Sequence, residues 1–172
     1  MFRAITVLVL LFTLTDAADA QTLGEIDQRI AAVREAWAAT PLTVRKAFFV
    51  AKHPDGFGQY VVRPNNVFKA GEKLVAYAEP VGYGWKDIGG GQYEFGFKVD
   101  FLIKTPDGKI LTGQQDFADL VEKSLARNLE FMVVLTLDVT GAPAGDYVVE
   151  YTLRDRTGPK STSVSLPFKI GE

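Results

Sequence analysis

Four segments of the chain alternate apolar and polar residues at every second position, and this pattern limits the fold more than any other feature. The clearest alternation runs from Tyr93 to Ile103, where one face of the segment is apolar and mostly aromatic. Similar alternation covers residues 131–139, 147–153 and 164–170. Successive side chains of a β-strand point to opposite faces of the sheet, so a period of two predicts half-buried strands. We expect the segment from Tyr93 to Ile103 to be the central strand of an antiparallel fold.

Turn residues separate these strands at the short intervals of an antiparallel fold. Pro54-Asp55-Gly56 and Pro106-Asp107-Gly108 each combine a proline, which fixes φ near about −65°, with a glycine that tolerates positive φ. Each is predicted to form a hairpin turn. Weaker strand patterns cover residues 43–52, 59–63, 73–79 and 109–113. Residues 116–129 fit either a short helix or an irregular edge strand.

An amphipathic helix is predicted before the strands. Thr22 and Glu25 have the spacing of a capping box, in which each side chain accepts a hydrogen bond from a free backbone N–H of the first turn. Apolar residues then recur at intervals of three and four: Leu23, Ile26, Ile30, Val33 and Trp37. We predict a helix within residues 21–41 that packs on its own domain or, alternatively, pairs with another chain.

About seven short strands after a single helix predict an all-β fold. Without alternating strands and helices, the natural arrangement is an antiparallel β-sandwich of two packed sheets over residues 42–172. The segment from Ala142 to Tyr147 is typical of a tyrosine corner, in which the Tyr147 hydroxyl donates a hydrogen bond to backbone a few residues upstream.

Several motifs resemble the immunoglobulin-like sandwich domains of exported bacterial proteins. They are Phe68-Lys69-Ala70-Gly71-Glu72, Val75 to Pro80, Pro143-Ala144-Gly145-Asp146-Tyr147, Asp155 to Ser161, and Leu166 to Ile170. The resemblance covers roughly residues 67–170 and implies an immunoglobulin-like fold. Because these motifs are turn and corner signals, the resemblance implies no catalytic residue.

The first twenty residues have the composition of a signal peptide. Met1-Phe2-Arg3 provides a basic start, residues 4–14 form an apolar run, and Ala18-Asp19-Ala20 matches the small-residue cleavage site of signal peptidases. That run is shorter than the roughly 20 residues of a membrane-spanning helix. We therefore predict cleavage near Ala20, a periplasmic or secreted protein, and no stable membrane anchor in the mature form.

Composition argues against several functional classes. The 172 residues include 19 Lys+Arg and 21 Asp+Glu, so nucleic acid is not an expected partner. The chain has no cysteine, and its single histidine, His53, lies in a predicted turn. A cysteine nucleophile and a multi-histidine metal site are therefore excluded within one chain. We expect no cofactor and no enzymatic activity. The least favoured alternative is a glycosidase-like carboxylate pair among Glu79, Glu94, Asp100, Asp116 and Asp119.

One loop offers groups suited to binding. Tyr83 and Trp85 lie among glycines that cannot cover them, and Lys86, together with Asn65 and Asn66 from another loop, would add hydrogen bonds where the loops converge. These five residues are the predicted ligand-binding site. The alternative is that Trp85 fills the end of the sandwich.

Two functions are compatible with these features. The first is an exported, non-enzymatic binding module that uses the aromatic loop, and a sheet edge, to hold an envelope protein, a peptide or a glycan. The alternative is a structural or assembly component of the bacterial cell envelope that docks through its N-terminal helix.

Overall fold

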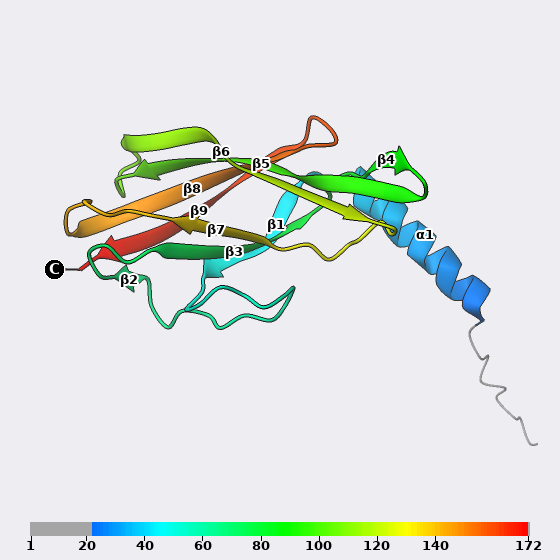
Figure 1. The fold of residues 1–172 in the computed structure, drawn as a ribbon, viewed down its shortest axis with the longest axis horizontal. Helices are drawn as coiled ribbons and strands as arrows, with labels where there is room; N and C mark the ends of the chain where they lie inside the picture. Colours follow the sequence, from blue (N-terminus) through cyan, green and yellow to red (C-terminus); the bar gives the residue numbers. More distant parts are fainter. Residues whose placement is uncertain (1–21, 172) are drawn as a thin grey trace, which may run out of the picture.

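The computed structural model describes residues 22–171, which form mostly β-structure with one helix (Figure 1). Helix α1 (Leu23–Ala39) precedes nine strands in this range: β1 (Thr43–Phe49), β2 (Val67–Phe68), β3 (Leu74–Val81), β4 (Lys86–Gly89), β5 (Gln92–Lys104), β6 (Ile110–Ser124), β7 (Val133–Leu137), β8 (Gly145–Asp155) and β9 (Ser161–Ile170). The predicted signal peptide, with its cleavage near Ala20, lies outside the described residues. The all-β prediction with an N-terminal helix is confirmed.

The strands form two sheets. The smaller sheet has the order β1-β3-β7, and the larger has the order β2-β9-β8-β5-β4, with β6 also paired to β5. Strand β5 pairs with β8 from Phe97 to Lys104 and with β6 along most of its length, so the prediction of a central strand is confirmed. All pairs are antiparallel except β2 with the end of β9.

One apolar core lies between the two sheets. Its members come from inward positions of both: Leu74, Ala76, Phe95, Phe97, Val99, Val133, Leu135, Val149, Tyr151 and Leu153. On β8, buried Val149, Tyr151 and Leu153 alternate with less buried residues, which is the period of two that the sequence displays.

Two turn predictions are confirmed by hydrogen bonds. The Gly108 N–H donates to the Thr105 carbonyl at 2.9 Å, which closes the hairpin between β5 and β6. The Tyr147 hydroxyl donates to the Pro143 carbonyl at 2.8 Å, which is the bond of a tyrosine corner. This corner lies where the chain passes from β7 in one sheet to β8 in the other.

The structure decides one open alternative and overturns one local prediction. Of the two alternatives for residues 116–129, the irregular edge strand is found: residues 116–124 extend strand β6, because pairing with β5 satisfies their backbone hydrogen bonds. The prediction of a strand at residues 59–63 is wrong. Residues 59–63 form no strand and make only isolated bridges, such as Val50 with Val62. Instead this loop covers the outer face of the small sheet, where Tyr60 packs against Phe48 and Tyr77.

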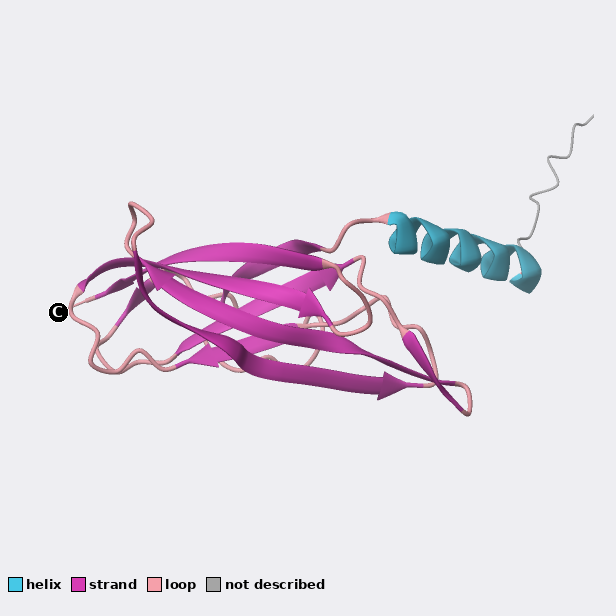
Figure 2. Cartoon of the chain, turned by 90° about the horizontal axis from the view of Figure 1, so that it is seen from above, coloured by secondary structure: helices cyan, strands magenta, loops and turns pink. Residues whose placement is uncertain are grey.

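Helix α1 projects from the end of the sandwich (Figure 2). The predicted capping box is confirmed, since Thr22 and Glu25 exchange both hydrogen bonds. Only Trp37 of the apolar positions is buried, whereas Leu23, Ile26, Ile30 and Val33 are 74%, 44%, 38% and 50% exposed. The prediction that α1 packs on its own domain therefore holds only for its last turn, where Trp37 enters the core, and not for the other four apolar positions.

Candidate functional site

The last turn of α1 is held by an aromatic cluster at the end of the sandwich. The Trp37 ring packs edge-on against Tyr83, with 5.1 Å between ring centroids, and stacks on Trp85 at 5.9 Å. The Trp37 Nε1–H donates to the Tyr83 carbonyl at 2.8 Å. We call Trp37, Gly82, Tyr83, Trp85 and Lys160 the helix socket.

Tyr83 and Trp85 direct their polar atoms into the protein. The Tyr83 hydroxyl donates to the Asn128 carbonyl at 2.9 Å, and the Trp85 Nε1–H donates to the same carbonyl at 3.0 Å. Tyr83 is 1% exposed, and burial raises the pKa of its hydroxyl well above the ordinary value for tyrosine. The arrangement corresponds to the alternative in which Trp85 fills the end of the sandwich.

Two glycines allow the aromatic loop to approach its neighbours closely. A Cβ atom on Gly82 would lie 2.7 Å from the Pro41 carbonyl oxygen, and the φ of Gly82 is 85°. A Cβ atom on Gly84 would lie 2.2 Å from the Thr157 Oγ1. The Gly84 N–H donates to the buried Asp155 carboxylate at 2.8 Å. The glycines around the aromatics thus serve close backbone packing rather than exposure of the rings.

Lys160 connects the C-terminal end of α1 to the loop between β3 and β4 by hydrogen bonds. Its Nζ donates to the carbonyls of Ala38, Thr40 and Gly82 at 2.9, 2.8 and 2.8 Å. The carbonyls at a helix C-terminus lack partners within the helix, and a cation there is favoured by the helix dipole. Sequence reasoning missed this role, and no local signal could have revealed it, because the bonded carbonyls lie 78 to 122 residues away.

Of the remaining predicted site residues, Lys86 directly follows Trp85, whereas Asn65 and Asn66 lie apart from the socket. Lys86 is exposed and pairs with Glu94 in the β4–β5 ladder. The Asn65 side chain accepts from the Val67 N–H, and the Asn66 side chain donates to the Pro167 carbonyl at 3.1 Å. Both asparagines precede β2, which lies at the opposite end of the sandwich from α1 (Figure 1). The five residues therefore do not converge on one surface.

At the end of the molecule where α1 is attached, apolar surface is exposed on the helix rather than on the aromatic loop. Leu23, Ile26, Ile30 and Val33, which we call the apolar stripe, occupy positions i, i+3, i+7 and i+10 of one helix. These spacings place the four side chains on one face. The rest of the helix carries three acidic and two basic residues: Glu25, Asp27, Arg29, Arg34 and Glu35.

The carboxylates considered for catalysis are mostly engaged in ion pairs. Arg154 binds both Asp100 and Asp116, and Arg156 binds Asp119. Although burial alone would raise it, the pKa of Asp100 is held below its ordinary value by hydrogen bonds from Arg154. Within residues 22–171, no three potential metal-binding side chains are grouped, and no helix is long and apolar enough to cross a membrane.

No protein-family model matches the sequence, and a search of the curated proteins finds no match either. The socket and the apolar stripe together form the candidate site, because the first fixes the helix and the second leaves an apolar face in solvent.

Proposed function

We propose that the protein is an exported, non-enzymatic interaction module whose projecting helix docks into an apolar groove of a partner protein in the cell envelope. The observation that supports this proposal is the exposure of four aliphatic side chains on a helix whose last turn is fixed in the helix socket. Contiguous apolar surface on an otherwise soluble protein commonly marks an interaction site. This function corresponds to the helix-docking alternative that the sequence left open.

The spacing of the apolar stripe suits a groove. Amphipathic helices bind apolar grooves through anchors at i, i+3 or i+4, and i+7, and the stripe from Leu23 to Val33 follows this pattern over three turns. Complete burial of an aliphatic side chain contributes roughly 1.5 to 3 kcal/mol before the cost of association is subtracted. Four anchors are thus sufficient for specific binding if the partner encloses the helix.

A second copy of the chain suits the stripe less well. In an antiparallel pair, Leu23 would oppose Val33 and Ile26 would oppose Ile30. The same register brings the two copies' Asp27 side chains together at one flank of the seam. A seam of four side chains also buries less than the roughly 800 Å² per partner of a stable interface.

An anionic membrane is also a poor match for the helix. Helices that lie on such membranes carry mainly Lys and Arg on their polar face, whereas α1 carries more acidic than basic residues. A groove in a protein therefore remains as the occupant we propose.

The helix socket supports the same conclusion through preorganisation. Trp37 and Lys160 join α1 to the Tyr83 loop by hydrogen bonds of 2.8 Å, so the helix leaves the sandwich in a fixed direction. Fixing the binding element before association lowers the entropy lost on binding. A helix that only linked two segments would not require such an attachment.

We also propose that the body is an immunoglobulin-like sandwich. The orders β1-β3-β7 and β9-β8-β5 correspond to strands A-B-E and G-F-C of that fold. The tyrosine corner at Tyr147 opens β8, which would be strand F. These features agree with the resemblance to exported immunoglobulin-like domains.

The proposal is tested with matched charge substitutions on two faces of α1. Ile26→Asp combined with Ile30→Asp places two charges in the apolar stripe, whereas Gln28→Asp combined with Ala31→Asp places them on the polar face. A photo-crosslinking residue at Asp27, which flanks the apolar stripe, would trap the partner in the source cells for identification by mass spectrometry.

We expect the stripe variant to lose the crosslinked partner and the polar-face variant to retain it. With the partner purified, calorimetry should show at least tenfold weaker binding for the stripe variant and a negative heat-capacity change for the unmodified protein. Equal binding by both variants would contradict the groove. A crosslink only between copies of this chain would identify a dimer instead.

A further inference from the structure

Strand β6 is an edge strand whose first half lacks the charges and prolines that usually protect an edge. From Ile110 to Gln115 it carries no charge and no proline, and all six residues are exposed. One register shift lies in this half, at Leu111 opposite Ile103 and Lys104, but Thr112 to Gln114 pair with β5 without interruption. Its only strand partner among the described residues is β5, so the other edge of β6 has no backbone ladder. Natural proteins usually protect such edges with charges, bulges or prolines, because a free edge binds other extended chains.

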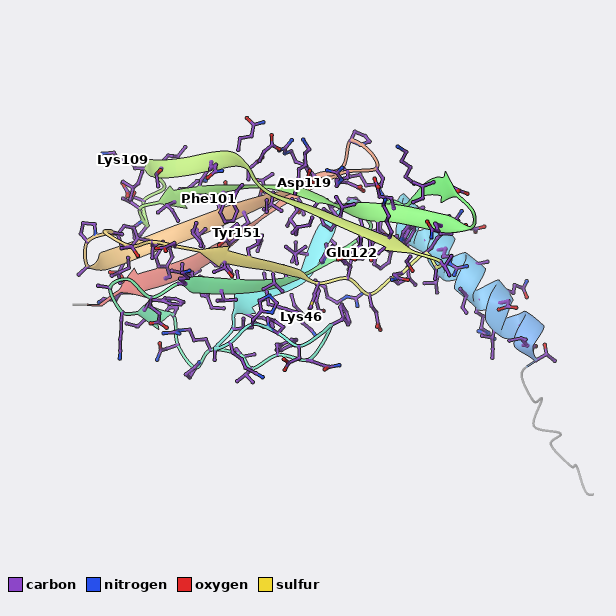
Figure 3. All side chains as sticks on the ribbon, in the orientation of Figure 1. Lys46, Phe101, Lys109, Asp119, Glu122 and Tyr151 are labelled. Carbon is purple, nitrogen blue, oxygen red and sulfur yellow. The ribbon has the colours of Figure 1, made fainter. Side chains whose placement is uncertain are left out.

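The second half of β6 has that protection. At Asp116 the φ is 51° and the ladder with β5 is interrupted between Val99 and Phe101. Asp119, Glu122 and Lys123 then follow. Figure 3 labels Asp119 and Glu122, and also Lys109, which precedes the strand and lies at its other end. The two halves therefore differ in charge, and only the first offers another chain an uncharged edge.

An apolar cavity of about 400 Å³ lies beside the unprotected half. Leu111 and Thr112 of β6, Phe101 and Ile103 of β5, and Leu137 at the end of β7 contribute to its lining, with residues 138–143 closing one side. Strand β7 is the edge of the small sheet. The cavity therefore lies between the edge strands of the two sheets.

We propose that the edge from Ile110 to Gln115 binds an extended peptide segment as an additional strand, with aliphatic side chains of that segment in the cavity. In strand addition, main-chain hydrogen bonds provide affinity and pockets for alternate side chains provide specificity. Alternate residues of a strand are about 7 Å apart on one face, so the cavity accepts one or two of them. This inference uses a different surface from α1 and goes beyond the proposed function.

Charge defines the segment further. Asp138 lies at the cavity, and hydrogen bonds from Thr140 hold the pKa of its carboxyl below the ordinary value, so it is ionised at neutral pH. Lining residues from β5 and β7 are apolar, and burial of an unpaired charge among them would be costly. The favoured segment therefore has uncharged residues facing the cavity and Lys or Arg, rather than Asp or Glu, near Asp138.

A second copy of β6 is a poorer occupant of this edge. Thr112 and Gln114 pair with Ile103 and Phe101 across the β5–β6 ladder, so they share the inward face of β6. Another copy paired in the same sheet would present these polar side chains to the apolar cavity. An alternating aliphatic segment from a different chain matches the lining better.

The test uses the isotopically labelled protein, as exported by an expression host, and a synthetic peptide with the sequence Lys-Thr-Val-Thr-Val-Thr-Val-Thr-Lys. A control peptide, in which two internal threonines are replaced by proline, keeps the valines but cannot form the ladder. Chemical-shift changes of backbone amides in the protein report where each peptide binds. Two edge variants are compared, Leu111→Lys and Val121→Lys, which replace aliphatic residues that are 46% and 39% exposed on the same strand.

We expect shift changes for residues 109–115 and 138–143 with the alternating peptide and at least tenfold weaker binding by the proline peptide and by Leu111→Lys. Val121→Lys and the stripe variant of α1 should bind the peptide as the unmodified protein does, which separates this inference from the helix proposal. No shift change at the highest soluble peptide concentration would overturn the inference, as would equal binding of the proline peptide. If the same residues show concentration-dependent shifts without peptide, the edge binds a second copy of this chain, and the peptide proposal is overturned.

Discussion

Replacement of Trp37 by alanine tests whether the helix socket is part of the cooperative fold. Trp37 is 7% exposed, its ring contacts Tyr83 and Trp85, and its Nε1–H is bonded to the Tyr83 carbonyl at 2.8 Å. Removal of a buried tryptophan side chain costs about 3 to 5 kcal/mol through lost transfer free energy and the cavity left behind. The carbonyl that loses its donor adds about 1 kcal/mol. We therefore expect the free energy of unfolding to fall by at least about 3 kcal/mol.

The assay is equilibrium unfolding in urea, followed by far-ultraviolet circular dichroism and by tryptophan fluorescence, which in Trp37→Ala comes from Trp85 alone. Val33→Ala is the matched control, because Val33 lies one turn earlier on the same stripe and is 50% exposed. We expect that control to change the free energy of unfolding by no more than about 0.5 kcal/mol. A loss below about 1 kcal/mol for Trp37→Ala would refute the reasoning, since it would mean that the helix detaches without cost to the sandwich. A reduced denaturant slope in the same variant would identify such detachment directly.

Three further predictions concern charge and titration. Lys160→Met should lower the free energy of unfolding by about 2 kcal/mol, measured in urea, because three carbonyls lose a charged donor. The hydrogen bond from Arg63 lowers the pKa of Glu72 in the folded state. This pair therefore stabilises the fold at pH values above the unfolded pKa of Glu72, and the stabilisation is lost as pH falls through the folded pKa. Glu72→Gln should reduce the loss of stability in acid, measured by urea unfolding at neutral and acidic pH. Burial raises the folded-state pKa of Tyr83 and Tyr151. The free energy of unfolding should therefore be unaffected by these groups below the pKa of tyrosine in the unfolded chain and decline as pH rises above it. Ultraviolet titration should show these two of the six tyrosines ionising only on unfolding.

The strands were predictable where the signal is local. Alternation identifies β5, β8 and β9, since one face of each strand packs in the core and the other is more exposed. The hairpin at Gly108 and the corner at Tyr147 were equally accessible, because each hydrogen bond spans only three or four residues. Local chemistry decides such features whatever the rest of the chain does.

Features that depend on distant residues were not predictable. The spacing of Phe117, Leu120 and Leu125 fits a helix as well as a strand, and only the partner strand β5 decides between them: Phe117 packs against Phe101 with 4.9 Å between ring centroids. Amphipathicity likewise reveals which face of α1 is apolar but not what covers it. The glycines around Tyr83 mark a loop, yet the inward direction of the ring depends on the Asn128 carbonyl, 45 residues away.

The two proposed surfaces lie at opposite ends of the sandwich, and this placement has a consequence for how they would act together. Lys109, at the start of the unprotected edge, lies far along the body from α1 in Figure 3. Substitutions at well-separated sites with no shared partners usually have additive effects. Docking of α1 into the partner's groove should therefore leave the affinity of β6 for the peptide unchanged, so that one molecule binds both partners at once. A change in peptide affinity on binding of the groove partner would instead show that the sandwich couples its two ends, and by thermodynamic reciprocity the peptide would alter helix docking by the same factor.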